Sequence, residues 1–98
     1  MSINKSRPIG FFDSGVGGIS IFNQVATQLP KENFLYLADS LNAPYGIRSQ
    51  KQIIDLSIKN TDLLVKKGCK MIVVACNTAT TNAIDTLRSK YDIPFIGI

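Results

Sequence analysis

The sequence predicts an α/β protein in three layers, with a parallel sheet built from the element order βαβαβαβ. Short apolar runs typical of buried strands recur along the chain, and segments with helical periodicity separate them. Alternation of this kind favours parallel pairing through right-handed crossovers. The expected strands cover residues 9–12, 34–38, 71–75 and 93–98.

The first strand is followed by a glycine-rich turn, Asp13-Ser14-Gly15-Val16-Gly17-Gly18. These glycines permit a tight turn and a close approach of the backbone to a ligand. The turn lacks both the Gly-Lys-Ser/Thr ending of phosphate loops and the glycine spacing of dinucleotide sites. Alternatively, Asp13 and Ser14 only satisfy the backbone of the turn. A helix then presents one apolar face until Pro30 stops it; that face consists of Ile19, Phe22, Val25, Ala26 and Leu29.

The second strand leads into a loop that contains Pro44-Tyr45-Gly46. This turn is either part of a binding site or an ordinary loop around a packed tyrosine. A helix follows, because Ser49 and Gln52 form a capping box and Gly68 is a good terminator. Its apolar face is expected to consist of Ile53, Leu56, Leu63 and Leu64.

The third strand ends just before Cys76, the residue with the clearest chemical potential. Asn77 or Thr78 can cap the helix that follows, which ends before Pro94. The thiol therefore lies at the carboxyl end of a strand, where open α/β sheets bind ligands. Unpaired amides and the helix dipole favour a thiolate there. The alternative is a buried structural cysteine.

The second cysteine, Cys69, lies at the other end of the same strand. Seven extended residues span ~20 Å, whereas a disulfide needs Cα atoms within about 7 Å. We therefore expect two free thiols, with Cys69 structural. Two cysteines form no disulfide framework, which fits a cytoplasmic location.

Composition narrows the class of protein. The 98 residues make one small domain, and a hydrophobic content of 45% suffices for a core. No apolar run approaches the ~20 residues of a membrane span, and the first seven residues lack the apolar stretch of a signal peptide. The net charge is +4, but Lys66, Lys67 and Lys70 suit a solvated helix end better than a nucleic-acid surface.

Taken together, the motifs resemble the amino-terminal half of glutamate racemases, in the aspartate/glutamate racemase family. The resemblance runs from about Pro8 to Ile98 and rests on the segments 9–18, 39–46 and 75–79, which occur in the family's order. It implies that residues 1–98 are the amino-terminal portion of the first racemase domain, an incomplete domain, with the second domain absent.

The resemblance also implies a mechanism without cofactor or metal. Family members place glutamate between two α/β domains and use one cysteine from each, so that one thiolate removes the α-proton while the opposite thiol protonates the other face. Cys76 is then the base toward D-glutamate, and Asp13 assists its proton transfer. The residues expected to hold the substrate are Asp13, Ser14, Pro44, Tyr45, Gly46, Asn77 and Thr78.

The implied partners are glutamate and either a second copy of the chain or the missing half of the enzyme. The partner cysteine of the family lies in a Cys-Thr-His motif, and this sequence contains no histidine. We therefore expect these residues alone to be inactive. Two alternatives remain open: a truncated binding or interaction module without catalysis, and a racemase for aspartate or another acidic amino acid.

Overall fold

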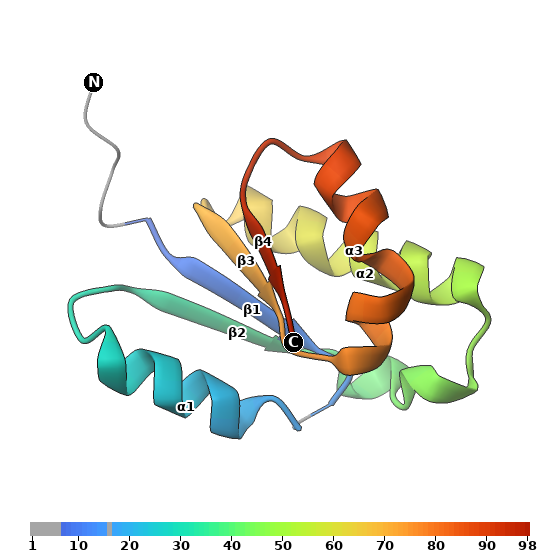
Figure 1. The fold of residues 1–98 in the computed structure, drawn as a ribbon, viewed down its shortest axis with the longest axis horizontal. Coiled ribbons are helices and arrows are strands. Elements are labelled where there is room, and N and C mark those ends of the chain that lie inside the picture. Colours follow the sequence, from blue (N-terminus) through green and yellow to red (C-terminus); the bar gives the residue numbers. More distant parts are fainter. Residues whose placement is uncertain (1–6, 16) are drawn as a thin grey trace.

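The structure is a computed structural model that describes residues 7–15 and 17–98. Four parallel strands form one sheet in the order β2-β1-β3-β4 (Figure 1). The strands are β1 (Ile9–Asp13), β2 (Phe34–Ala38), β3 (Met71–Val74) and β4 (Phe95–Gly97). The helices are α1 (Ile19–Gln28), α2 (Gln50–Lys66) and α3 (Asn77–Lys90), with two short 3₁₀ helices, η1 (Ser40–Asn42) and η2 (Tyr45–Ile47). The predicted α/β class and element order are confirmed.

Three layers result, because α1 covers one face of the sheet while α2 and α3 cover the other (Figure 1). Successive side chains of a strand point to opposite faces. Accordingly, Phe11 packs with Phe22 of α1, whereas Phe12 joins a core with Leu64 of α2 and Leu87 of α3. Both faces of the central strands are thus buried, which explains their almost continuous apolar sequence.

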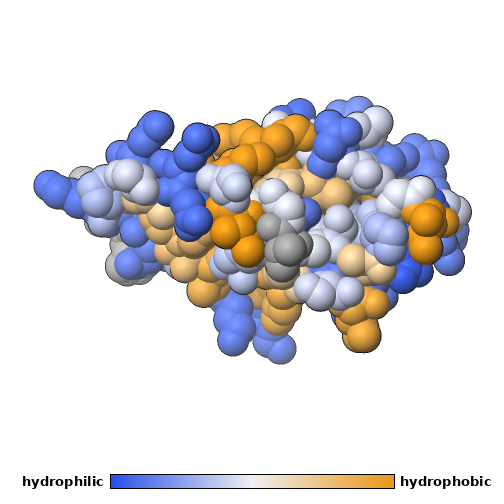
Figure 2. Space-filling model, turned by 90° about the horizontal axis from the view of Figure 1, so that it is seen from below, coloured by the Kyte–Doolittle hydropathy of each residue, from blue (hydrophilic) through white to orange (hydrophobic). Residues whose placement is uncertain are grey.

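Helix α1 confirms the predicted segment but not all of its predicted face. Phe22 and Val25 pack against the sheet, whereas Ile19 and Leu29 are 43% and 45% exposed. The helix ends at Gln28 with Leu29 as its C-cap. The apolar strand residues beneath α1 contact the middle of this ten-residue helix, so its ends remain open to solvent. Seen from the α1 side, apolar residues emerge in several patches between hydrophilic side chains (Figure 2).

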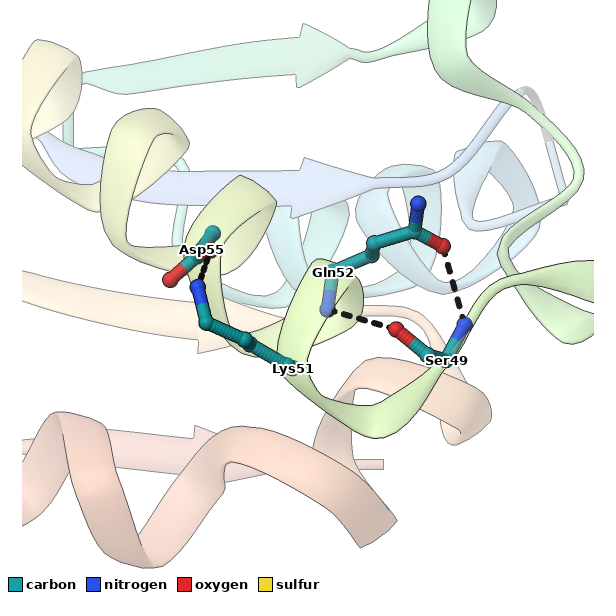
Figure 3. A network of polar contacts seen from close by, with 4 residues as sticks. All are labelled: Ser49, Lys51, Gln52 and Asp55. Atoms are coloured by element: carbon teal, nitrogen blue, oxygen red, sulfur yellow. Dashed lines mark hydrogen bonds and ion pairs between the residues drawn. The ribbon is translucent and has the colours of Figure 1, made fainter.

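Helix α2 begins as predicted. The Ser49 hydroxyl accepts a hydrogen bond from the backbone amide of Gln52 at 3.2 Å, and the side-chain oxygen of Gln52 accepts one from the backbone amide of Ser49 at 3.0 Å (Figure 3). An exposed ion pair between Lys51 and Asp55 spans the next turn at 2.9 Å. The helix stops before Gly68, whose φ of +90° is a conformation that side chains disfavour.

Leu63 is the exception on the predicted apolar face of α2. It is 43% exposed, whereas Ile53 and Leu64 are buried and Leu56 packs against them. The buried face instead includes three polar residues, Ser57, Asn60 and Thr61. Within the described residues, none of the helices is both long and apolar enough to cross a membrane.

Candidate active site

The site lies at the carboxyl edge of the sheet, where β1 and β3 are neighbours. The helices that follow these two strands leave toward opposite faces of the sheet: α1 follows β1 and α3 follows β3 (Figure 1). Open α/β sheets bind ligands at the carboxyl ends of two neighbouring strands whose following connections run to opposite faces of the sheet. Asp13 is the last residue of β1 and Cys76 comes just after β3, so both residues lie at this edge.

Cys76 is itself the N-cap of α3. Its Sγ accepts from the backbone amide of Ala79 at 3.5 Å and lies 3.4 Å from the Ser14 hydroxyl. The prediction that Asn77 or Thr78 caps the helix is therefore wrong, because both belong to its first turn. A sulfur at this position meets the free amides and the positive dipole end of the helix, which favour negative charge.

The Asp13 carboxylate organises the loop after β1 and is 4% exposed. It accepts hydrogen bonds from the amides of Ser14, at 2.7 Å, and Gly18, and from the Tyr36 hydroxyl at 3.1 Å. Within the described residues no hydrogen bond joins Asp13 to Cys76; instead Ser14, the next residue, contacts the sulfur. Asp13 thus fixes the loop that brings a hydroxyl to the thiol.

Tyr36 is a site residue that sequence reasoning missed. Burial, the charge of Asp13 and the hydrogen bond to Asp13 together raise the pKa of its hydroxyl to about 12. The hydroxyl therefore remains a hydrogen-bond donor at neutral pH. The sequence pattern could have indicated this contact. Every second residue of a strand points to the same face of the sheet, so side chains from neighbouring strands β1 and β2 meet on that face. Tyr36 pairs in register with Phe11, two residues before Asp13.

The loop after β2 brings the second predicted motif to this edge. Tyr45 is 1% exposed, and its hydroxyl donates to Asp39 at 2.5 Å while accepting from the Asn60 amide at 2.8 Å. The ring is therefore a packed core residue, as the alternative interpretation held, and its hydroxyl is engaged internally. Pro44 and Gly46 on either side are exposed. Asn60 lies in α2, outside every motif, and was not predicted.

Burial and hydrogen bonding act in opposite directions on the carboxyl group of Asp39. Burial favours its neutral form, but hydrogen bonds from Tyr45, Asn42 and Asn60 outweigh this and lower its pKa. Burial also raises the pKa of Tyr45, as do the hydrogen bond and the charge of Asp39. An ionised carboxylate with a neutral phenol is therefore the stable state of the pair at neutral pH.

Cys69 lies at the opposite edge of the sheet and is fully buried. Burial raises the pKa of its thiol, although the Arg7 guanidinium opposes the effect. Both cysteines are free, as predicted. Among residues 7–15 and 17–98, no group of three or more His, Cys, Asp or Glu side chains is arranged to hold a metal ion.

The Asp/Glu/Hydantoin racemase family model matches residues 14–98 of the chain. A glutamate racemase from Clostridium botulinum (strain Hall) is 57% identical over all 98 residues, which span 38% of its length. The glutamate racemase of Thermus thermophilus, solved with β-chloro-D-alanine, superposes with a TM-score of 0.93 at 37% identity, over 97% of this chain and 37% of that one.

The Escherichia coli glutamate racemase, solved with L-glutamate and the activator UDP-MurNAc-Ala, also superposes on this chain. Its TM-score is 0.87 at 35% identity, over 94% of this chain and 35% of that one. The chain thus corresponds to a little more than a third of the length of these relatives.

Proposed function

Because the chain belongs to the Asp/Glu/Hydantoin racemase family, we propose that it is part of a glutamate racemase, an isomerase that interconverts L- and D-glutamate without a cofactor. The identity of 57% to a glutamate racemase along the whole chain supports this assignment. So does the likeness to a racemase solved with L-glutamate. Residues 1–98 would form the amino-terminal portion of the first domain, and a second domain would complete the enzyme.

The observation that carries the proposal is the position of Cys76. Its sulfur lies at the amino end of α3, within 3.4 Å of the Ser14 hydroxyl and 3.5 Å of the Ala79 amide. These groups can stabilise a thiolate. As a thiolate, Cys76 removes the α-proton of D-glutamate and becomes a thiol, while a thiol on the opposite face donates its proton to the carbanion and becomes a thiolate. The reverse reaction regenerates both groups.

The substrate would lie at the carboxyl ends of β1 and β3, between the loops that lead to α1 and α3. Asn77 is exposed and Thr78 is partly exposed in the first turn of α3, so both can reach a carboxylate beside the sulfur. Ser14 has its hydroxyl at the thiol. The turn at Pro44 and Gly46 can contribute backbone groups, since the Tyr45 hydroxyl is already paired with Asp39 and Asn60. Asp13 supports proton transfer by holding Ser14 in place.

The opposite-face acid is expected to come from outside these residues. Cys69 lies at the other end of β3 and cannot reach the same carbon. Large apolar side chains also remain open, with Leu41 92% and Ile47 81% exposed, and β4 forms an edge of the sheet. We therefore propose that the second racemase domain or another copy covers this surface. A single monomeric species of the chain in sedimentation would contradict association between copies.

The cellular role follows from the product. D-Glutamate is a building block of peptidoglycan, so the enzyme would serve cell-wall synthesis and cell shape from the cytoplasm, with no nucleic-acid or membrane partner. The same chemistry applied to aspartate would use the same thiol. Assays with both amino acids separate these possibilities.

The test follows the circular dichroism of L- and D-glutamate with the full-length protein. We expect racemisation in the wild type and in Cys69→Ala, and a loss of ~10²–10⁴-fold or more in Cys76→Ala, because a general acid–base group contributes that much. Residues 1–98 alone should be inactive. Equal activity of Cys76→Ala and Cys69→Ala would contradict the assignment, as would a wild type that racemises only aspartate.

A further inference from the structure

Asn60 is a buried polar residue that none of the motifs includes. It lies in the second half of α2 and is 6% exposed. Its side-chain amide donates to the Tyr45 hydroxyl at 2.8 Å and to the Asp39 carboxylate at 3.4 Å. A buried amide is retained at little cost only when its hydrogen bonds are satisfied. The side-chain amide of Asn60 donates its hydrogen bonds to residues of the loop that follows β2.

Asp39, Tyr45 and Asn60 form one network, hereafter the Asp39–Tyr45–Asn60 network. It connects the end of β2, the 3₁₀ helix η2 and the long helix α2. Asn42 also donates to Asp39, at 2.9 Å, and its carbonyl accepts from Arg48 at 2.9 Å. The loop is therefore closed on itself, and Asn60 contributes its hydrogen bonds from a regular secondary-structure element.

The network adjoins the thiol. Tyr45 and Cys76 belong to the same buried cluster, and η2 packs against α3, the helix that Cys76 caps. Beside the turn, the Ala43 methyl group lies 4.0 Å from where a side chain on Gly15 would begin. The negative charge of a Cys76 thiolate also contributes to the raised pKa of Tyr45. A displacement of Tyr45 would therefore disturb both loops of the site.

We propose that Asn60 is a positioning residue for racemisation, which sets the Pro44–Gly46 turn against Cys76 by holding the Tyr45 hydroxyl. This inference rests on the proposed function, since the turn is expected to hold the substrate. Asn60 acts through Tyr45 and touches no reacting atom. In other functional sites, residues that do not touch the substrate likewise fix the orientation of a functional group by hydrogen bonding to it.

The physical basis is the sensitivity of catalysis to geometry. Without Asn60, the Tyr45 hydroxyl keeps its bond to Asp39 but loses the bond that ties both to α2, so the turn can shift as a unit. A displacement of ~1 Å in a substrate-positioning group can lower a rate by ~10²-fold. Because substrate contacts are affected, we expect KM to rise as well as kcat/KM to fall.

The experiment compares Asn60→Leu with Thr61→Val in the full-length racemase. Thr61 is the next residue in α2 and is fully buried, and its hydroxyl has no hydrogen-bond partner among residues 7–15 and 17–98. Removing that hydroxyl should therefore be nearly neutral. We expect kcat/KM for glutamate to fall about tenfold or more in Asn60→Leu, with a raised KM, and to stay within about twofold of wild type in Thr61→Val.

A double-mutant cycle with Tyr45→Phe separates positioning from general destabilisation. If Asn60 acts through the hydroxyl, Asn60→Leu should cause little further loss in a Tyr45→Phe background. Losses that multiply independently would overturn the proposal, as would wild-type kcat and KM in Asn60→Leu. If Asn60→Leu does not fold, Tyr45→Phe must show the raised KM on its own, and wild-type values there would overturn the proposal.

Iodoacetamide labelling of Cys76 tests the positioning role of Asn60 independently of the proposed racemase activity. If the wild type does not racemise glutamate, the proposed function fails, but the positioning role still predicts that loosening the turn exposes the thiol. Labelling should then be several-fold faster in Asn60→Leu than in wild type or Thr61→Val. An unchanged rate would contradict the positioning role whatever the substrate.

Discussion

Cys69 and Cys76 lie at opposite ends of β3 and are both buried, yet they have different surroundings. The Cys69 sulfur packs among Gly10, Leu64 and the rest of the core, and burial raises its pKa. The Cys76 sulfur meets the Ser14 hydroxyl and the Ala79 amide at a helix end. Burial alone therefore does not distinguish the two thiols; the polar groups at the sulfur do.

The two edges of the sheet differ in the same way. At the amino edge, the Arg7 side chain donates to the carbonyl oxygens of Gly68 and Cys69, and Lys70 forms an ion pair with Glu32. These contacts join the segments that precede β1, β2 and β3. At the carboxyl edge, polar side chains instead bond one another, as Tyr36 does with Asp13 and Tyr45 with Asp39, and the Ser14 hydroxyl lies at the Cys76 thiol. The following predictions test this contrast, and they are ordered by the size of the expected effect.

The largest effect is expected for Gly18→Ala at the carboxyl edge. A Cβ there would lie 2.8 Å from the Ala75 Cβ and 3.0 Å from both the Asp13 carboxylate and the Tyr36 hydroxyl. The Ala75 Cβ cannot rotate away, so we expect a destabilisation toward the upper end of the ~1–3 kcal/mol that overpacking costs. The proposed racemase activity should fall with it, because the loop that carries Ser14 must move.

Gly46→Ala is the matched control for Gly18→Ala. Apart from its two neighbours in the chain, no heavy atom of the described residues lies within 4 Å of a Cβ at Gly46. The stability of Gly46→Ala should therefore differ from that of the wild type by less than about 0.5 kcal/mol. Urea unfolding of both variants in the full-length protein provides the comparison. Equal midpoints for the two variants would show that the loop around Asp13 is not tightly packed.

A smaller effect is expected for Gly10→Ala at the amino edge. The new Cβ would lie 2.8 Å from the Cys69 sulfur and 3.1 and 3.2 Å from methyl groups of Ile72 and Leu64. These are side-chain atoms that can shift, so we expect a loss of about 1 kcal/mol. Cys69→Ala makes room, and the double variant should be less destabilised than the sum of the single changes. Strictly additive unfolding free energies would show that Cys69 does not fill this space.

The smallest effect is expected for Tyr36→Phe and appears at alkaline pH. The folded-state pKa of Tyr36, about 12, lies above its ordinary value of 10.0. Its contribution to stability is therefore complete below pH 10 and is lost as pH rises through 12. Tyr36→Phe removes this contribution, so its unfolding midpoint should fall less than that of the wild type between neutral pH and pH ~11. Parallel decreases would indicate that Tyr36 makes no such contribution.

The sequence was sufficient to predict the order of the elements, the capping box of α2 and the position of Cys76 between the end of β3 and the start of α3. Each of these follows from a local pattern or from the topology that alternation imposes. The internal pairing of Tyr45 and the hydrogen bonds of Asn60 could not be predicted in the same way. They depend on contacts between the loop after β2 and helix α2 over long sequence distances, as in the Asn60–Tyr45 bond.

The exposed positions of α1 and α2 illustrate another limit. Periodicity placed Ile19, Leu29 and Leu63 on apolar faces, yet each is more than 40% exposed. The period of a helix indicates which direction a side chain takes, but not how far the neighbouring layer extends beneath it. The cap of α3 was likewise misassigned, because the sulfur of Cys76 fills a position that hydroxyl and amide side chains usually occupy.

The central claim is that Cys76, and not Cys69, is the reactive thiol. Iodoacetamide labelling of the folded full-length protein, followed by peptide mapping, compares the two residues within one molecule. Cys76 should be modified at least about tenfold faster, because Cys69 is fully enclosed and reacts only when the core opens. Denaturation should remove most of the difference. Faster or equal labelling of Cys69 in the folded protein would contradict the assignment of the site.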